Sequence, residues 1–183
     1  MKLEYGLFHE ENDYFFFNPE QDKEKEYMLV GMLIGLAIYN AVILDVAFPT
    51  VIFKKLAGQP GVFSDLEEFE PDIYRNLSKL LDYDVDTMDA LELTFTIDSN
   101  ELEDNGSEKK VTRANCHEYV ELYSDFLLNK SIEKSFNAFE RGFQLVTHNS
   151  PLTSLFRPEE LESMVIGQRE YDWSALKESM ILK

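Results

Sequence analysis

The chain has little cysteine and little positive charge. It contains one cysteine, Cys116, and 17 lysine and arginine residues against 35 aspartate and glutamate residues, for a formal net charge of −18. A single cysteine excludes an internal disulfide framework and fits a reducing compartment. Because basic side chains supply most nucleic-acid affinity, this charge argues against nucleic acid and against anionic membrane surfaces as partners. The excess acid either keeps the protein soluble or attracts a basic protein partner.

Catalytic motifs are also missing. The histidines His9, His117 and His148 lie far apart in the sequence, and no phosphate-loop or metalloprotease motif is present. Carboxylate pairs are too common in such an acidic chain to indicate a site. Cys116 precedes His117, but adjacent side chains on a helix point about a hundred degrees apart. We therefore expect Cys116 to be a packed or surface thiol rather than a nucleophile, and no metal or cofactor site is predicted.

One long uncharged run, residues 27–44 (YMLVGMLIGLAIYNAVIL), raises the possibility of a membrane helix. Its length lies at the lower limit for a transmembrane helix, and Gly31 and Gly35 have the GxxxG spacing of membrane helix pairs. Tyr39 and Asn40 interrupt the run, however, and acidic rather than basic residues flank it. The preferred interpretation is a central buried helix in which the two glycines let neighbouring elements approach closely.

Turn residues and apolar periodicity divide the rest of the chain into mostly helical segments. A β-hairpin is predicted over residues 4–17, and a helix begins at Pro71, where proline is tolerated. Alternating apolar residues over 91–97 predict a strand, followed by an acidic loop and a return over 110–112. Further helices are predicted over 48–55, from 112 to 148, over 151–156 and 158–166, and from 172 onward with Trp173 packed inward. The predicted fold class is α+β, mostly helical, with two small antiparallel β elements.

Residues 70–125 are expected to form a smaller, semi-independent unit, because a helix–strand–loop–helix segment can bury its own small core. Residues 1–69 and 126–183 then form a larger helical unit. Apolar side chains of the smaller unit could converge into a docking groove with a polar rim. The alternative is that the same side chains are the core of that unit, and periodicity alone favours this alternative. The residues concerned are Ile73, Leu77, Tyr83, Leu91, Leu93, Tyr119 and Tyr123, with Asp89 and His117 on the rim.

Several long motifs resemble a known family. FNPE, LVGMLIGLAIYNAVILDVAFP, LYSDFLLNKSIEKSFNAFERGF, SPLTSLFRPEEL and IGQREYDWSAL occur in the order found in the amino-terminal lobe of HECT-type ubiquitin-protein ligases. They are most similar to the branch that contains the Angelman-syndrome ligase. The resemblance implies a bilobal fold whose smaller subdomain holds a ubiquitin-conjugating enzyme, and it places that docking groove on the nine residues named above. Glu92 and Tyr119 depart from the residues usual in that branch, which affects the choice of partner.

The resemblance also implies a function for the parent protein. Such a ligase accepts ubiquitin from the conjugating enzyme onto its own cysteine and passes it to a lysine of an unknown protein substrate. The lobe that carries this cysteine has no counterpart in the chain, so the chain alone is expected to be inactive and to supply docking only. The expected location is the cytoplasm, with the nucleus as a second compartment. The alternative function is a non-catalytic helical interaction module with a HECT-like fold.

Overall fold

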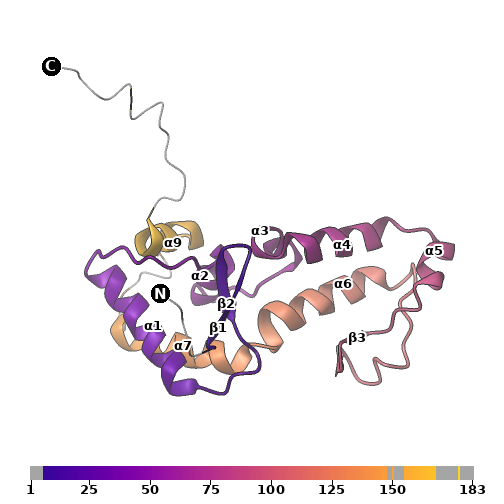
Figure 1. Cartoon of the computed structure of the whole chain (residues 1–183), viewed down its shortest axis with the longest axis horizontal. Helices are drawn as coiled ribbons and strands as arrows, with labels where there is room; N and C mark the ends of the chain where they lie inside the picture. The colour runs from indigo at the N-terminus through magenta and orange to yellow at the C-terminus, as the bar shows by residue number, and fades with distance from the viewer. Residues whose placement is uncertain (1–5, 148–149, 151–154, 168–176, 178–183) are drawn as a thin grey trace.

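The structure is a computed structural model that describes residues 6–147, 150, 155–167 and 177. Figure 1 shows a helical base from which an arm extends to one side. We use base for residues 6–69 and 126–167, and arm for residues 70–125. The base contains β1 (Phe8–Glu11), β2 (Tyr14–Phe17), α1 (Glu24–Tyr39), α2 (Thr50–Leu56), η1 (Phe63–Asp65), α3 (Leu66–Phe69), the π-helical turn η2 (Phe126–Lys130), α7 (Glu133–Thr147) and α9 (Pro158–Ile166). The arm contains α4 (Pro71–Asp82), α5 (Val85–Ala90), β3 (Thr96–Ile97), β4 (Asn100–Glu101) and α6 (Cys116–Asp125).

The predicted hairpin is confirmed. Strands β1 and β2 pair antiparallel from Phe8 opposite Phe17 to Glu11 opposite Tyr14. Both residues of the connecting turn, Asn12 and Asp13, have positive φ angles of 49° and 66°. This backbone conformation matches the right-handed twist of the flanking strands and is favoured by asparagine and aspartate. The hairpin thereby turns the ring of Phe17 into the core, where it is fully buried.

Helices α1 and α7 cross at very close range in the base. A Cβ atom on Gly31 would collide with the main-chain carbonyl of Phe139, and a Cβ atom on Gly142 would collide with that of Met28. Only glycine therefore fits at these two positions, because any side chain would force the helix backbones apart. The close approach expected at Gly31 from the sequence is confirmed.

The expectation of a central, buried helix over residues 27–44 is wrong in two respects. Helix α1 ends at Tyr39, and Ala41, with a φ angle of 51°, turns the chain away from the helix axis. The helix also has an exposed apolar stripe opposite the α7 contact, formed by Leu29, Leu33 and Leu36. Among the described residues, no helix is both long enough and apolar enough to span a membrane.

The strand predicted over residues 91–97 is wrong for most of its length. Glu92 has a φ angle of 49°, so the chain bends sharply where the alternating pattern required extended backbone. Extended pairing is limited to β3 with β4 and to a single bridge between Thr94 and Lys110. The described residues still contain two small antiparallel sheets among helices, and the predicted α+β, mostly helical class is confirmed.

The single long helix predicted over 112–148 is interrupted. Helix α6 ends at Asp125, the chain then makes the π-helical turn η2, and α7 begins at Glu133. Buried apolar residues of the base and the arm form one continuous cluster, and the division into two domains stays a prediction. Helix α9 confirms the segment predicted over 158–166. Residues 151–154 of another predicted helix, and the predicted segment from 172 with Trp173, lie outside the described residues.

Candidate docking site

The arm holds α4 and α6 side by side, with α5 at its tip (Figure 1). Helix α4 begins at Pro71, as predicted. Helix α5 was not predicted, although Asp84 and Thr87 have the spacing of a helix N-cap. The Asp84 carboxylate accepts a hydrogen bond from the Thr87 N–H at 2.8 Å, and interactions with Thr87 lower the pKa of Asp84. This cap explains why a short helix begins at Val85.

Two of the predicted docking residues belong to the core. Leu77 and Tyr119 are 6% and 5% exposed, respectively. The Tyr119 ring packs edge-on against the rings of Phe95, at 5.5 Å between centroids, and Tyr123, at 5.8 Å. Burial, followed by the neighbouring Tyr123, raises the pKa of Tyr119 to about 12. Leu77 and Tyr119 therefore belong to the packed interior and present little area to a partner.

Four further predicted residues line the outer side of this core. Ile73, Tyr83, Leu93 and Tyr123 are half-buried and pack against the buried cluster. Burial raises the pKa of the Tyr123 hydroxyl, and the nearby carboxylates of Asp98 and Glu70 raise it further. Tyr123 therefore has a neutral hydroxyl at physiological pH, and its side chain is half-buried with the ring against that of Tyr119.

The remaining predicted residues are exposed. Leu91 is 43% exposed and lies just after α5, and Asp89 and His117 are exposed as well. The structure adds Val85, which is 56% exposed on α5, a helix that the apolar periodicity did not indicate. We use arm patch for the accessible apolar residues of this region. They are Ile73, Tyr83, Val85, Leu91, Leu93 and Tyr123.

The surroundings of the arm patch are strongly acidic. Residues 70–125 contain 15 acidic and 5 basic side chains, a formal net charge of −10. One of the few cations is already paired, because Lys109 Nζ lies 2.6 Å from a Glu103 carboxylate oxygen and 3.0 Å from one of Glu118. The same ammonium group lies 3.9 Å from the centre of the Phe95 ring. It therefore fastens the loop after β4 to α6 and leaves the negative field of the arm largely uncompensated.

Cys116 is fully buried at the start of α6. Its thiol donates to the Arg113 carbonyl at 3.4 Å, and the Arg113 guanidinium lies 3.6 Å from the sulfur. His117, the next residue, is exposed. The two side chains thus lie in different environments, and the geometry supports the packed-thiol interpretation rather than a thiol–imidazole pair.

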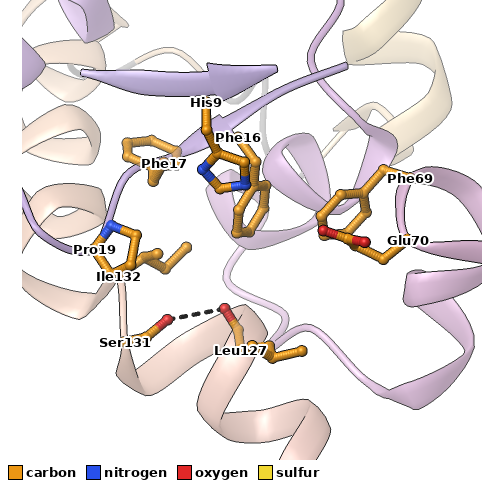
Figure 2. Close-up of a pocket in the computed structure, with 9 residues that line it drawn as sticks. All are labelled: His9, Phe16, Phe17, Pro19, Phe69, Glu70, Leu127, Ser131 and Ile132. Atoms are coloured by element: carbon orange, nitrogen blue, oxygen red, sulfur yellow. Dashed lines mark hydrogen bonds between the residues drawn. The ribbon is translucent and has the colours of Figure 1, made fainter. Parts of the chain in front are cut away.

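A pocket of about 70 Å³ lies where the hairpin meets α3 and η2 (Figure 2), and it shares no lining residue with the arm patch. Its walls are mainly apolar, but His9 and Glu70 contribute polar edges. Burial lowers the pKa of His9 and raises that of Glu70, so the pocket favours the neutral forms of both. The sequence pattern gave no signal for this pocket. It is lined by His9, Phe16, Phe17, Pro19, Phe69, Glu70, Leu127, Ser131 and Ile132.

Comparison of the sequence with known proteins identifies a family. A family model described as HECT-domain (ubiquitin-transferase) matches residues 1–183. Human probable E3 ubiquitin-protein ligase HERC4 is 36% identical over 187 residues, which covers 96% of this chain and 18% of that protein. Probable E3 ubiquitin-protein ligase mug30 of Schizosaccharomyces pombe is 38% identical over 188 residues, covering 95% and 23%.

Mouse probable E3 ubiquitin-protein ligase HECTD2 is likewise 38% identical over 201 residues, covering 96% of this chain and 26% of that protein. The chain thus spans between 18% and 26% of the length of these relatives. Both the family match and the identities extend over almost all of the sequence. The chain belongs to the HECT-domain (ubiquitin-transferase) family.

Proposed function

We propose that this chain is the part of a HECT ubiquitin-protein ligase that recruits and positions a ubiquitin-conjugating enzyme through its arm. The observation that carries this proposal is the arm patch, in which Leu91 and Val85 are exposed on an arm whose interior holds the packed rings of Phe95 and Tyr119. An apolar surface on a fixed support, surrounded by charge, is typical of a protein-docking site. A partner fits best if it inserts an apolar or aromatic side chain and surrounds it with basic residues.

In the proposed reaction, the parent protein transfers ubiquitin in two steps. A cysteine thiolate of the ligase, outside this chain, attacks the thioester on the conjugating enzyme, forms a new thioester and releases that enzyme's cysteine as a thiolate. The amine of a substrate lysine then attacks the new thioester, which forms an amide bond and frees the ligase cysteine. The arm contributes to the first step by holding the conjugating enzyme near its acceptor, which raises the effective concentration of the two sulfur atoms.

The proposal is tested by titrating the isotope-labelled chain with a panel of ubiquitin-conjugating enzymes and following its amide resonances. We expect shifts that cluster on residues 73–93 and 117–123. Replacing the partner's inserted aromatic residue by alanine should weaken them. A panel that causes no shifts in the arm would contradict the proposal. Shifts confined to the base would contradict it as well.

A second candidate function is a non-catalytic interaction module. It is favoured by the burial of Leu77 and Tyr119, which leaves a shallower surface than an open groove. Binding of a partner other than a conjugating enzyme to the arm patch would support it.

The finer placement of the chain, in the branch of the family that contains the Angelman-syndrome ligase, is proposed on motif similarity. A cytoplasmic and nuclear location is proposed with it.

A further inference from the structure

The chain enters the arm at Glu70 and leaves it through the π-helical turn η2. At the entry, α3 ends at Phe69 and α4 begins at Pro71, so a single residue joins the two helices. At the exit, the regular hydrogen-bond pattern changes, because the Ser131 N–H binds the Phe126 carbonyl five residues back at 2.9 Å. These two short connections are the points at which a hinge can act. The angle between arm and base then depends on how firmly each connection is held, together with packing between the two parts such as the Phe63 ring of η1 on the Tyr74 ring of α4, at 4.8 Å between centroids.

Two main-chain carbonyl groups of η2 accept hydrogen bonds from side chains. The Ser131 hydroxyl donates to the Leu127 carbonyl at 3.1 Å. The ammonium group of Lys55, on α2 of the base, donates to the Leu128 carbonyl at 2.7 Å and to the Asn129 side-chain oxygen at 2.8 Å. A π-helical turn is rare, so we expect these donors to stabilise a conformation that the backbone alone seldom adopts.

Asn129 forms a second connection between η2 and the base. Its side-chain oxygen accepts from the Gly61 N–H at 3.0 Å, and its amide donates to the Gly61 carbonyl at 2.9 Å. The same amide donates to the Asp125 carboxylate at 2.9 Å, at the end of α6. A Cβ atom on Gly61 would lie 2.8 Å from the Leu128 Cβ atom, so the loop and the turn are in close contact. Asn129 therefore links the loop of the base, the turn and the last residue of the arm.

We propose that Lys55 and Asn129 act as a lock that holds η2 in its π-helical form and thereby fixes the angle between the arm and the base. Lys55 is well placed for this role because its ammonium group also lies 4.7 Å from the centre of the Phe136 ring on α7. Asp125, Glu133 and Glu140 supply the surrounding negative charge. The lock concerns the hinge alone and does not require that a conjugating enzyme binds the arm.

The angle can be measured by pulsed electron paramagnetic resonance between spin labels on introduced cysteines. Leu145 of α7 and Asp86 of α5 are suitable sites, because both are exposed and they lie in the base and the arm, respectively. The native Cys116 is fully buried and should not react with the label. The unmodified hinge is expected to give one narrow distribution of distances.

Lys55→Met keeps most of the apolar stem but removes the donors, and Asn129→Ala removes the link to Gly61. Both are expected to broaden or shift the distance distribution and to speed exchange of the Ser131 amide. For Lys55→Met the increase should be about tenfold, the change expected from one lost charged hydrogen bond. Lys55→Arg, which restores donors, should keep the narrow distribution. The matched control is Lys54→Met, which removes the neighbouring lysine, paired with Asp65 at 2.7 Å inside the base.

Distributions for Lys55→Met and Asn129→Ala as narrow as in the unmodified protein, at the same distance, would overturn the proposal. Equal broadening in Lys54→Met would overturn it too, because it would point to general loosening of α2. If circular dichroism shows that Lys55→Met does not fold, the distance distributions of Asn129→Ala and Lys55→Arg still test the proposal. The test contains no conjugating enzyme, so its outcome is independent of the proposed function.

Discussion

Replacing Tyr119 by alanine should destabilise the protein much more than replacing Leu91. The Tyr119 side chain is 5% exposed and packs on two aromatic rings, whereas Leu91 is 43% exposed. Truncating a buried aromatic residue costs about 3–5 kcal/mol through lost burial and the cavity left behind. Leu91→Ala should cost less than about 1 kcal/mol, because nearly half of its side chain is already in water.

Urea denaturation followed by circular dichroism measures both free energies of unfolding. The expected loss for Tyr119→Ala is a large part of the roughly 5–15 kcal/mol that stabilises a typical domain. Tyr119→Phe is the matched control, since it keeps the ring and its contacts with Phe95 and Tyr123, and it should change stability by less than about 1 kcal/mol. A Tyr119→Ala variant as stable as the unmodified chain, with the same denaturant slope, would refute the assignment of Tyr119 to the core.

Three other changes test the fold and its ionisation. Gly142→Ala should cost about 3 kcal/mol in thermal or urea unfolding, because the added methyl group collides with the Met28 carbonyl. Gly35→Ala should cost distinctly less, because its Cβ atom would meet the Val146 Cβ atom at 3.0 Å and the Phe143 carbonyl at 3.3 Å, without a collision. Equal losses of stability in the two variants would contradict the close crossing of α1 and α7. Burial lowers the pKa of His9 in the folded state, so at pH values below its usual pKa of 6.5 the unfolded chain binds more protons. The unmodified protein should therefore lose stability relative to His9→Gln as the pH falls from about 7 to 5. Parallel curves of unfolding free energy against pH for the two proteins would refute this. Burial is the main reason that the pKa of Lys55 is about 8 in the folded state, against 10.5 in the unfolded chain. The free energy of unfolding, measured relative to Lys55→Met, should therefore increase as the pH is raised from about 8 to 10.5. A relative free energy of unfolding that decreases over this range would contradict the prediction.

The helical part of this fold could be predicted because its signals are local. Pro71 marks a helix start, apolar residues recur at helical spacing, and Asn12-Asp13 suits a tight hairpin turn. The prediction of a strand over 91–97 was wrong for most of its length, because alternation of apolar residues does not reveal a backbone bend. The positive φ angle at Glu92 follows from how α5 ends, and α5 depends on the cap that Asp84 provides.

The sequence could predict which residues belong to the candidate site, but not how deeply each of them is buried. Periodicity identifies the inner face of α6, and Tyr119 and Tyr123 are both on it. Whether a neighbouring element covers that face depends on long-range packing, and here Phe95 covers Tyr119 while Tyr123 stays half-open. The π-helical turn could not be predicted either, because the apolar stripe of the sequence continues through it. Its hydrogen-bond partners, Lys55 and Gly61, are more than sixty residues away in sequence.

The central claim is that the arm patch binds a ubiquitin-conjugating enzyme. The most direct measurement compares, by isothermal titration calorimetry, the affinity of such an enzyme for Leu91→Ala and for Leu29→Ala. Both leucines are exposed, at 43% and 55%, but Leu29 lies on α1 of the base. The account predicts about a tenfold loss of affinity for Leu91→Ala, as for a residue central to an interface, and none for Leu29→Ala. Unchanged binding by Leu91→Ala, or equal loss in both variants, would contradict it.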